Sequence, residues 1–368
     1  MNHTTTKLCA AIALLGATSA WAQSSSVTIY GIADVAAEYD SGVNAGAGKS
    51  GNQMRMGLGT WPSRLGFRGT EDLGGGQKAL FNLEAGLNLD TGGLGQGRMF
   101  GRQASVGLSG GFGTVLLGRL YSMRYYGMMD TDFFGPGSHG LGTVDSGIPN
   151  TRIDNAVSWR GSAGPFSGGL SYSLGRDTVA GNNPTATGCA GESATDTSQC
   201  REWSAMAKYD GGRWGVVTAY ERQNGGTAAT YGGLTSSNLT DSRFSLGGYL
   251  HAAGGKLGVG WLARNNEGST TTPRSNLFWL VGEKRISAPV TLTGMVAHIS
   301  FKDSANKATL LTLRAGYALS KRTTVYVSDA YIRNSGTLAL AASANSPGTG
   351  PLPGRAQNSL QVGITHRF

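Results

Sequence analysis

The chain has 368 residues, of which 60 are glycine and only 14% carry a charge. Lysine and arginine outnumber aspartate and glutamate by 31 to 22, which gives a formal net charge of +9. Strand-like aromatic segments recur throughout, so the composition excludes a disordered chain and does not fit an ordinary soluble enzyme, although a soluble all-β protein stays open. The basic residues are scattered singly, so we predict no nucleic-acid partner and a basic cavity or surface field instead.

The first 22 residues have the pattern of a cleaved signal peptide. Lys7 supplies the positive start, residues 8–17 form a short apolar stretch, and Ala20 to Ala22 form a small-x-small cleavage site. The apolar stretch is shorter than the ~20 residues that a transmembrane helix needs. We therefore predict an exported mature chain over residues 23–368, forming one domain whose net charge falls to +8 because Lys7 is removed.

The mature chain alternates between strand-like segments and fifteen connections, which predicts sixteen strands. Seven connections are short turns, at residues 71–76, 109–113, 161–165, 210–212, 252–255, 287–289 and 319–322. Eight are longer, at residues 41–52, 92–98, 121–150, 177–199, 224–238, 266–274, 302–307 and 336–355. This spacing leaves room for the ~9–11 residues of a tilted spanning strand. Short turns at one end and long loops at the other are typical of outer-membrane barrels.

Several predicted strands have one apolar and one polar face, because successive side chains of a strand point to opposite sides. In the strand that starts at Phe166, apolar residues alternate with Ser and Gly, and residues 311–319 alternate likewise, with Arg314 on the polar face. A soluble sandwich alternates too, but sixteen strands, an export signal and no dense apolar core set favour a membrane barrel. Over residues 323–333 neither face is uniformly apolar, so no register is predicted there.

The two ends of the mature chain are predicted to meet, because open sheet edges are intolerable in lipid. We expect the first strand, residues 27–39, to pair with the last, residues 355–368. The fold is therefore predicted as an all-β, 16-stranded antiparallel transmembrane β-barrel. A terminal aromatic residue on an apolar strand face looks like the recognition signal of barrel assembly. The face in question carries Leu360, Val362, Ile364, His366 and the final residue, Phe368.

The third long connection, residues 121–150, is the longest irregular stretch, and loops of this length are usually functional or disordered. Arg119 and Arg124 flank its start. We predict that it is the constriction loop of a pore, with a mobile external loop as the alternative. Its aromatic residues could pack on the wall, and its acids could face the pore. These residues are Tyr126, Phe133, Phe134, Asp130, Asp132 and Asp145.

Two cysteines, Cys189 and Cys200, remain after the signal peptide is removed. An even pair in an oxidising compartment predicts a disulfide, which would stabilise the short loop by roughly 3 kcal/mol in the chain-entropy model. A metal pair is the alternative, but no histidine or third cysteine lies near in the sequence. We predict no metal site and no cofactor.

Five sequence blocks resemble the general porins of β-proteobacteria and Neisseria. They are SVTIYG at residues 26–31, SRLGFRGTEDLGGG at 63–76, GLSGGFGTV at 107–115, YALSKRTT at 317–324 and the final HRF. The resemblance covers the full mature chain. It implies a trimer of sixteen-stranded barrels, each with its own pore, in which the third long loop folds inward.

The resemblance also implies basic residues on the wall that faces this loop. Arg64, Arg102 and Arg152 match three of them, Arg68 shares the strand face of Arg64, and Arg314 lies on a polar face. A cationic wall at a narrow constriction attracts anions, and acids across the pore would add a transverse field. Salt bridges to neighbouring acids are the alternative role for each arginine.

These features predict an outer-membrane general diffusion porin that passes small hydrophilic solutes and inorganic ions and prefers anions. Its expected partners are two further copies in a homotrimer, outer-membrane lipid and lipopolysaccharide, and the barrel-assembly machinery. A substrate-specific channel for phosphate, a carboxylate or a sugar is the alternative. A barrel without a pore, such as an adhesin, would conduct no ions.

An enzyme is not predicted, because catalysis needs a nucleophile, a base and an orienting group that converge. The histidines of the mature chain lie in no motif of this kind. They are His139, His251, His298 and His366.

Overall fold

The computed structural model of the chain describes residues 25–148, 151–175, 189, 191–227, 233–344 and 348–368. The predicted signal peptide lies outside these residues. Eighteen strands form one antiparallel sheet. They are β1 (Ser25–Asn44), β2 (Ser50–Leu58), β3 (Arg64–Gly74), β4 (Gln77–Asn88), β5 (Gly93–Gly95), β6 (Gln103–Gly110), β7 (Gly113–Tyr121), β8 (Arg152–Ala163), β9 (Phe166–Gly175), β10 (Glu202–Asp210), β11 (Trp214–Asn224), β12 (Thr240–Ala252), β13 (Gly255–Asn266), β14 (Arg274–Arg285), β15 (Val290–Phe301), β16 (Lys307–Ala318), β17 (Thr323–Ser335) and β18 (Ala356–Arg367).

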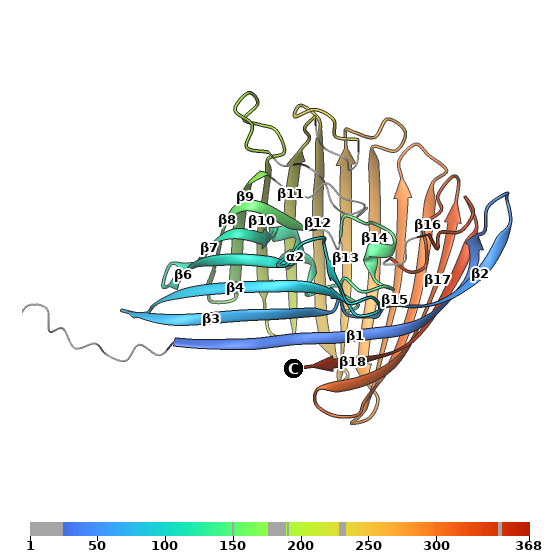
Figure 1. The fold of residues 1–368 in the computed structure, drawn as a ribbon, viewed down its shortest axis with the longest axis horizontal. Coiled ribbons are helices and arrows are strands. Elements are labelled where there is room, and N and C mark those ends of the chain that lie inside the picture. Colours follow the sequence, from blue (N-terminus) through green and yellow to red (C-terminus); the bar gives the residue numbers. More distant parts are fainter. Residues whose placement is uncertain (1–24, 149–150, 176–188, 190, 228–232, 345–347) are drawn as a thin grey trace, which may run out of the picture.

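The eighteen strands make a barrel of sixteen, because two of the assigned pieces are halves of one strand and one is a short appendage. The second half of β1 pairs with β2 and its first half pairs with β3, along the same edge. The three-residue β5 pairs with the end of β4. Figure 1 shows the strands fanning from nearly horizontal β1, β3 and β4 to nearly vertical β11 to β13, as in a strongly tilted barrel. The predicted fold class is confirmed.

The barrel closes between its first and last strands, as predicted. β1 and β18 pair from Ile32 with Arg367 to Asp40 with Ser359. The main chain of Gly31 and that of Phe368 exchange two hydrogen bonds, of 3.0 and 3.2 Å. A Cβ on this glycine would lie 2.7 Å from Cε2 of the terminal ring, so the absence of a side chain lets that ring lie across β1.

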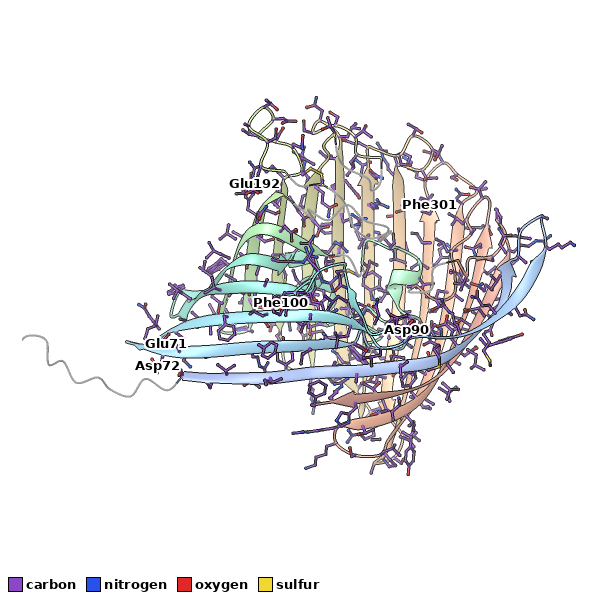
Figure 2. The ribbon with its side chains drawn as sticks, viewed as in Figure 1. Glu71, Asp72, Asp90, Phe100, Glu192 and Phe301 are labelled. Carbon is purple, nitrogen blue, oxygen red and sulfur yellow. A yellow bond between two sulfur atoms is a disulfide. The ribbon has the colours of Figure 1, made fainter. Side chains whose placement is uncertain are left out.

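Each predicted short turn joins two neighbouring strands, and the described parts of the predicted long connections follow the opposite ends of those strands. Figure 2 shows Glu71 and Asp72 at the turn end of β3, far from Glu192 in the loop that follows β9. The alternation of long and short connections is thus observed over the described residues. By the usual orientation of outer-membrane barrels, the turn end faces the periplasm and the loop end faces outside.

Apolar side chains cover the outer wall. Leu170 and Tyr172 of β9 and Leu311 and Leu313 of β16 point outward and are exposed, as the alternation predicts. The register of β17 is now defined, since Tyr326 points inward and is buried. Near the loop end, aromatic rings of neighbouring strands contact one another and form a belt of the kind found at membrane interfaces. The belt contains Tyr172, Trp203, Tyr220, Phe244, Trp261 and Phe278.

The expectation that the barrel lacks a dense apolar core is wrong. A cluster of buried apolar residues fills one side of the lumen, between the inner wall of β13 to β17 and the third long loop. Its wall part includes Leu277, Trp279 and Ile299, and its loop part includes Phe134 and Leu141. In this part of the wall both faces of a strand are apolar, because one faces the lipid and the other faces the loop. Apolar and polar residues therefore do not alternate there, and the sequence pattern does not reveal the cluster.

Among the described residues, helical structure is confined to short pieces of the third long loop. They are α2 (Met123–Met128) and a 3₁₀ turn at Leu141–Thr143. Within the described residues, no helix is long and apolar enough to cross a membrane.

Candidate functional site

The loop between β7 and β8 folds into the lumen, as Figure 1 shows for α2. The first turn of α2 is fixed to the wall by polar contacts. The main-chain N–H of Met123 donates to Oγ of Ser204 (2.7 Å), and Arg124 pairs with Glu221 of β11 (Nε–Oε1, 3.0 Å). Both charged side chains are buried, so breaking the pair would leave an uncompensated charge.

Further along, the loop crosses to the opposite wall. Trp279 of β14 donates from Nε1 to the carbonyl oxygen of Thr131 (2.9 Å). Both ring nitrogens of His139 contact serine hydroxyls, Nδ1 that of Ser328 (2.8 Å) and Nε2 that of Ser359 (3.1 Å). Burial lowers the pKa of His139 to about 4, so the ring is neutral at pH 7. It anchors the loop to β17 and β18.

Three of the predicted wall arginines surround one tyrosine at the end of β7. Arg102 pairs with Glu84 of β4 (Nε–Oε1, 2.5 Å) and donates from Nη2 to the hydroxyl of Tyr121 (3.0 Å). Arg152 lies over the same ring, with its Cζ 5.1 Å from the ring centre, and its Nη2 donates to the tyrosine hydroxyl (3.4 Å). Arg64 interacts electrostatically with Arg102 and with this tyrosine. The structure thus brings Arg64, Arg102 and Arg152 together.

Aromatic rings of α2 pack beside this group. Tyr125 stacks on Tyr121 with ring centres 3.9 Å apart, and Tyr126 meets Tyr125 edge-on at 5.5 Å. Arg160 of β8 lies over Tyr126 (Cζ to ring centre, 4.1 Å). Burial raises the pKa of Tyr125 to about 12, so this ring adds no negative charge beside the arginines.

The other two predicted arginines lie apart from this group. Arg68 is exposed and sits over the ring of Tyr30 (5.0 Å) on β1. Arg314 of β16 lies over the ring of Phe134 (4.5 Å) and donates from Nη2 to the carbonyl oxygen of Phe133 (3.4 Å). It therefore faces the far part of the loop.

The loop acids Asp130 and Asp132 are engaged elsewhere. Asp130 pairs with Lys208 of β10 (Oδ2–Nζ, 2.9 Å). Asp132 is buried, and its Oδ1 accepts from the main-chain N–H groups of Phe134 (3.2 Å) and Gly135 (3.1 Å). Burial raises the pKa of Asp132 to about 7, so it carries only part of a charge at neutral pH.

Asp145 lies in a buried ionic network. It faces Arg243 of β12 (Oδ2–Nε, 3.6 Å), which also pairs with Asp241 (2.9 Å). Burial alone would raise the pKa of Asp145, but the charges of Arg243, Arg264 and Arg124 outweigh it and hold this pKa below its usual range. The ion pairs of the loop acids are thus with cations other than Arg64, Arg102 and Arg152.

The acids on the inner face of β1 also form hydrogen bonds or ion pairs with neighbouring side chains. Asp34 accepts from the hydroxyls of Tyr326 and Thr365 (2.6 Å each) and ties β1 to β17 and β18. Glu38 pairs with Arg55 of β2 (2.5 Å) and accepts from the side-chain amide of Gln361. Neither acid is exposed to the lumen water.

Sequence reasoning missed most of the counter-charges. The one signal in the sequence was the alternation of side chains along each strand, which places each of these residues on the lumen face. This alternation does not say which side chain of a neighbouring strand each residue contacts. The missed residues with the clearest roles are Glu84, Asp154, Glu221, Asp241 and Arg243.

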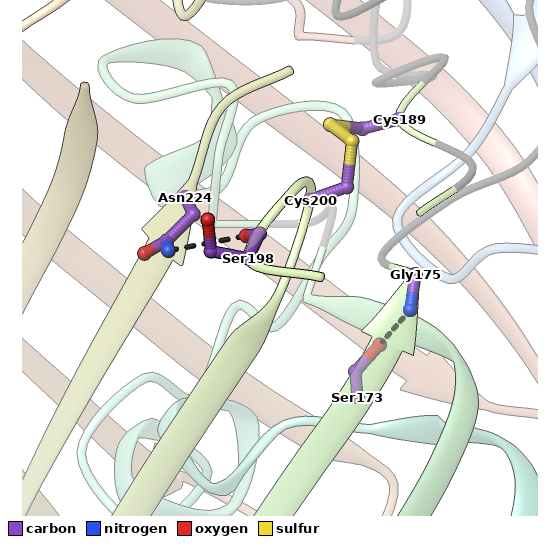
Figure 3. The surroundings of a disulfide bond; sticks show 6 residues. All are labelled: Ser173, Gly175, Cys189, Ser198, Cys200 and Asn224. Atoms are coloured by element: carbon purple, nitrogen blue, oxygen red, sulfur yellow. Dashed lines mark hydrogen bonds between the residues drawn. A yellow bond between two sulfur atoms is a disulfide. The ribbon is translucent and has the colours of Figure 1, made fainter. Parts of the chain in front are cut away.

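The predicted disulfide is confirmed. Cys189 and Cys200 are joined, with both side chains buried in the loop region between β9 and β10 (Figure 3). The main-chain N–H of Cys200 donates to the carbonyl oxygen of Gly225 (2.9 Å), which links this loop to the one after β11. Among the described residues, no group of three or more His, Cys, Asp or Glu side chains could hold a metal ion.

A closed barrel with an apolar outer wall, a charged lumen and an inward loop defines a transmembrane β-barrel channel. The Gram-negative porin family matches residues 8–337, so the chain belongs to this family. It is 32% identical to outer membrane porin protein 32 of Delftia acidovorans, over 97% of this chain and 98% of that protein. It is 28% identical to an outer membrane porin protein of Bordetella pertussis, over 98% and 99%.

Solved structures agree with the sequence relatives. An anion-selective porin from Comamonas acidovorans superposes with a TM-score of 0.75 at 26% identity, covering 94% of this chain and all of that one. A trimer form of OmpT from Vibrio cholerae shares the fold, with a TM-score of 0.63 at 16% identity. The chain is thus a porin of the outer membrane and a general diffusion channel, as predicted from its residues and their resemblance.

Proposed function

We propose that the channel prefers anions, and that the wall arginines Arg64, Arg68, Arg102, Arg152 and Arg314 supply the preference, with the charge of Arg102 offset by Glu84. The observation that carries the proposal is the pairing of charges. Arg64, Arg68 and Arg314 form no ion pair within the described chain, whereas the loop acids Asp130 and Asp145 are held by other cations. A surplus of positive charge in a narrow, low-dielectric passage concentrates anions. The anion-selective porin from Comamonas acidovorans, similar over its whole length, supports this proposal.

The test is the zero-current potential of the reconstituted channel in a KCl gradient. We expect an anion-selective sign, and a shift toward zero in the double variant Arg64→Gln/Arg68→Gln. The matched control is Arg222→Gln/Arg333→Gln, which removes two exposed charges from the outer face of β11 and β17. The proposal fails if the wild type prefers cations, or if both double variants shift the potential equally. Conductance that saturates with a single solute would indicate a substrate-specific channel instead.

A homotrimer is part of the same proposal. The outer face of β1 carries the small residues Gly31, Ala33 and Ala37; the Phe368 ring covers Gly31, and the two alanines allow close approach of another wall. OmpT from Vibrio cholerae, which shares the fold, is described in a trimer form. We expect conductance to rise in steps of three, and light scattering to report three chains. A single-chain mass in detergent would refute the trimer.

Phe368 is proposed as the residue that the barrel-assembly machinery recognises. Substitution by Ala is expected to lower the amount of folded protein in the outer membrane, while the unfolded chain accumulates in the periplasm. Unchanged outer-membrane levels of the variant would contradict this role.

A further inference from the structure

Two adjoining hollows lie at the turn end of the lumen. One, of about 800 Å³, is lined by the turn between β12 and β13 together with Arg213, Lys256 and Arg285. The other, of about 300 Å³, lies beside the turn between β16 and β17. Glu283 and Thr291 line both, so the hollows form one periplasmic vestibule.

The vestibule is strongly basic. Its second hollow is lined by Arg314, Lys321, Arg322 and Arg367, and Glu283 is the one acid that lines either hollow. No cation named for the two hollows forms an ion pair with any residue that the structure describes. Glu283 offsets part of the charge of Lys256 and Arg314, and the remaining positive charge is left for ions in the water.

The four cations of the second hollow are held close together by the fold. The main-chain N–H of Arg367 donates to the carbonyl oxygen of Arg322 (2.9 Å), so the end of β18 lies beside the turn between β16 and β17. Arg367 lies over the ring of Trp61 (5.1 Å), which fixes its direction into the lumen. Thr324 and Thr365 line the same hollow, and the hydroxyl of Thr365 is held by Asp34 (2.6 Å).

The loop end of the lumen is different, because its arginines are neutralised by acids. Arg124 pairs with Glu221 (3.0 Å), and Arg243 and Arg264 both pair with Asp241 (2.9 and 2.8 Å). These charges cancel locally and project little field into the water. The uncompensated positive charge of the pore is thus concentrated at the constriction and on its periplasmic side.

We infer that the periplasmic vestibule is a retention site for small multivalent anions, such as oligophosphates and polycarboxylates, and that it makes the channel one-sided. The inference rests on the proposed anion preference and extends it. Attraction grows with the product of the charges, so an anion of three or more charges is held where chloride passes. Guanidinium groups also match phosphate and carboxylate oxygens in a bidentate manner.

The test is one-sided addition of tripolyphosphate to single channels in a planar bilayer. We expect block from the turn side at roughly tenfold lower concentration than from the loop side, and little block by acetate from either side. The variant Lys321→Gln/Arg322→Gln/Arg367→Gln is expected to lose this difference, so that both sides need the same concentration.

A matched control separates the site from overall charge. The variant Arg222→Gln/Arg333→Gln/Lys307→Gln removes three charges from the outer face and is expected to keep the one-sided block. Both variants should keep the anion-selective sign of the zero-current potential, because the constriction arginines are intact.

Two results would overturn the inference while leaving anion preference standing. One is equal block from both sides in an anion-selective wild type. The other is an unchanged one-sided block in the vestibule variant. A wild type that prefers cations would instead refute the proposed function from which the inference starts.

Discussion

The apolar cluster inside the lumen makes a specific prediction about the constriction loop. Leu141 belongs to the 3₁₀ turn of that loop, has no exposed surface and packs in the cluster. Replacing a buried Leu by Ala costs about 2–5 kcal/mol, partly in lost transfer free energy and partly in the cavity left behind. A loss of about 3 kcal/mol in docking free energy raises the population of the detached loop roughly 100-fold.

Single-channel recording measures this change directly. The variant Leu141→Ala is expected to show greater open-channel noise and excursions to a larger conductance, because the loop leaves the lumen more often. Leu311→Ala is the matched control, since Leu311 is 49% exposed on the outer face of β16 and loses the same atoms. If Leu141→Ala conducts as quietly as the wild type, the loop is held by its polar anchors alone and our reasoning is refuted.

Three further predictions concern closure, the disulfide and pH. Gly31→Ala is expected to lower the free energy of unfolding by about 1–3 kcal/mol, because the new Cβ meets the Phe368 ring. In samples heated to increasing temperatures before electrophoresis, the folded band of this variant should disappear at a lower temperature than that of the wild type. An unchanged transition temperature would count against the closure contact. Reducing the Cys189–Cys200 bond should speed cleavage after the exposed Glu192 by a glutamyl endopeptidase, reflecting about 3 kcal/mol of lost constraint, with conductance unchanged; equal cleavage would contradict this. Burial raises the pKa of Asp132 to about 7 and lowers that of His139, in the same loop, to about 4, so between about pH 4 and 6.5 a rise in pH weakens loop docking through Asp132 and strengthens it through His139. Asp132→Asn keeps an acceptor oxygen for both N–H groups and leaves the His139 effect alone, so channel noise should fall as pH rises from about 4 to 6.5, and noise that rises over this range would contradict the assignment.

The strands could be predicted because their signal is local. A segment such as 166–175 carries its apolar and polar faces in its own order of residues, and seven glycine-, proline- or serine-containing turns separate such segments. Closure followed from the same information, since a spanning sheet with free edges is excluded in lipid. The register of β17 could not be predicted, because its outer face carries Asp329 and its inner face carries Ile332.

The candidate site was only partly predictable. The resemblance supplied Arg64, Arg102 and Arg152, and the structure brings them around Tyr121. It gave no reason to pair Asp145 with Arg243, which lies on a strand far along the chain.

By itself, the sequence determined that this chain is a closed membrane barrel with sixteen strands, a long third loop and an excess of positive charge. These properties depend on residue order over ten or twenty positions. Only the tertiary structure decided which side-chain charges are neutralised by an opposite charge and which act on ions in the pore, because the two partners of an ion pair come from strands that are distant in the sequence. It neutralises Arg124 with Glu221 at the loop end and leaves Arg322 and Arg367 unpaired at the turn end. It also explains why some inner faces of the wall are apolar although the lumen is polar: the third long loop packs against them.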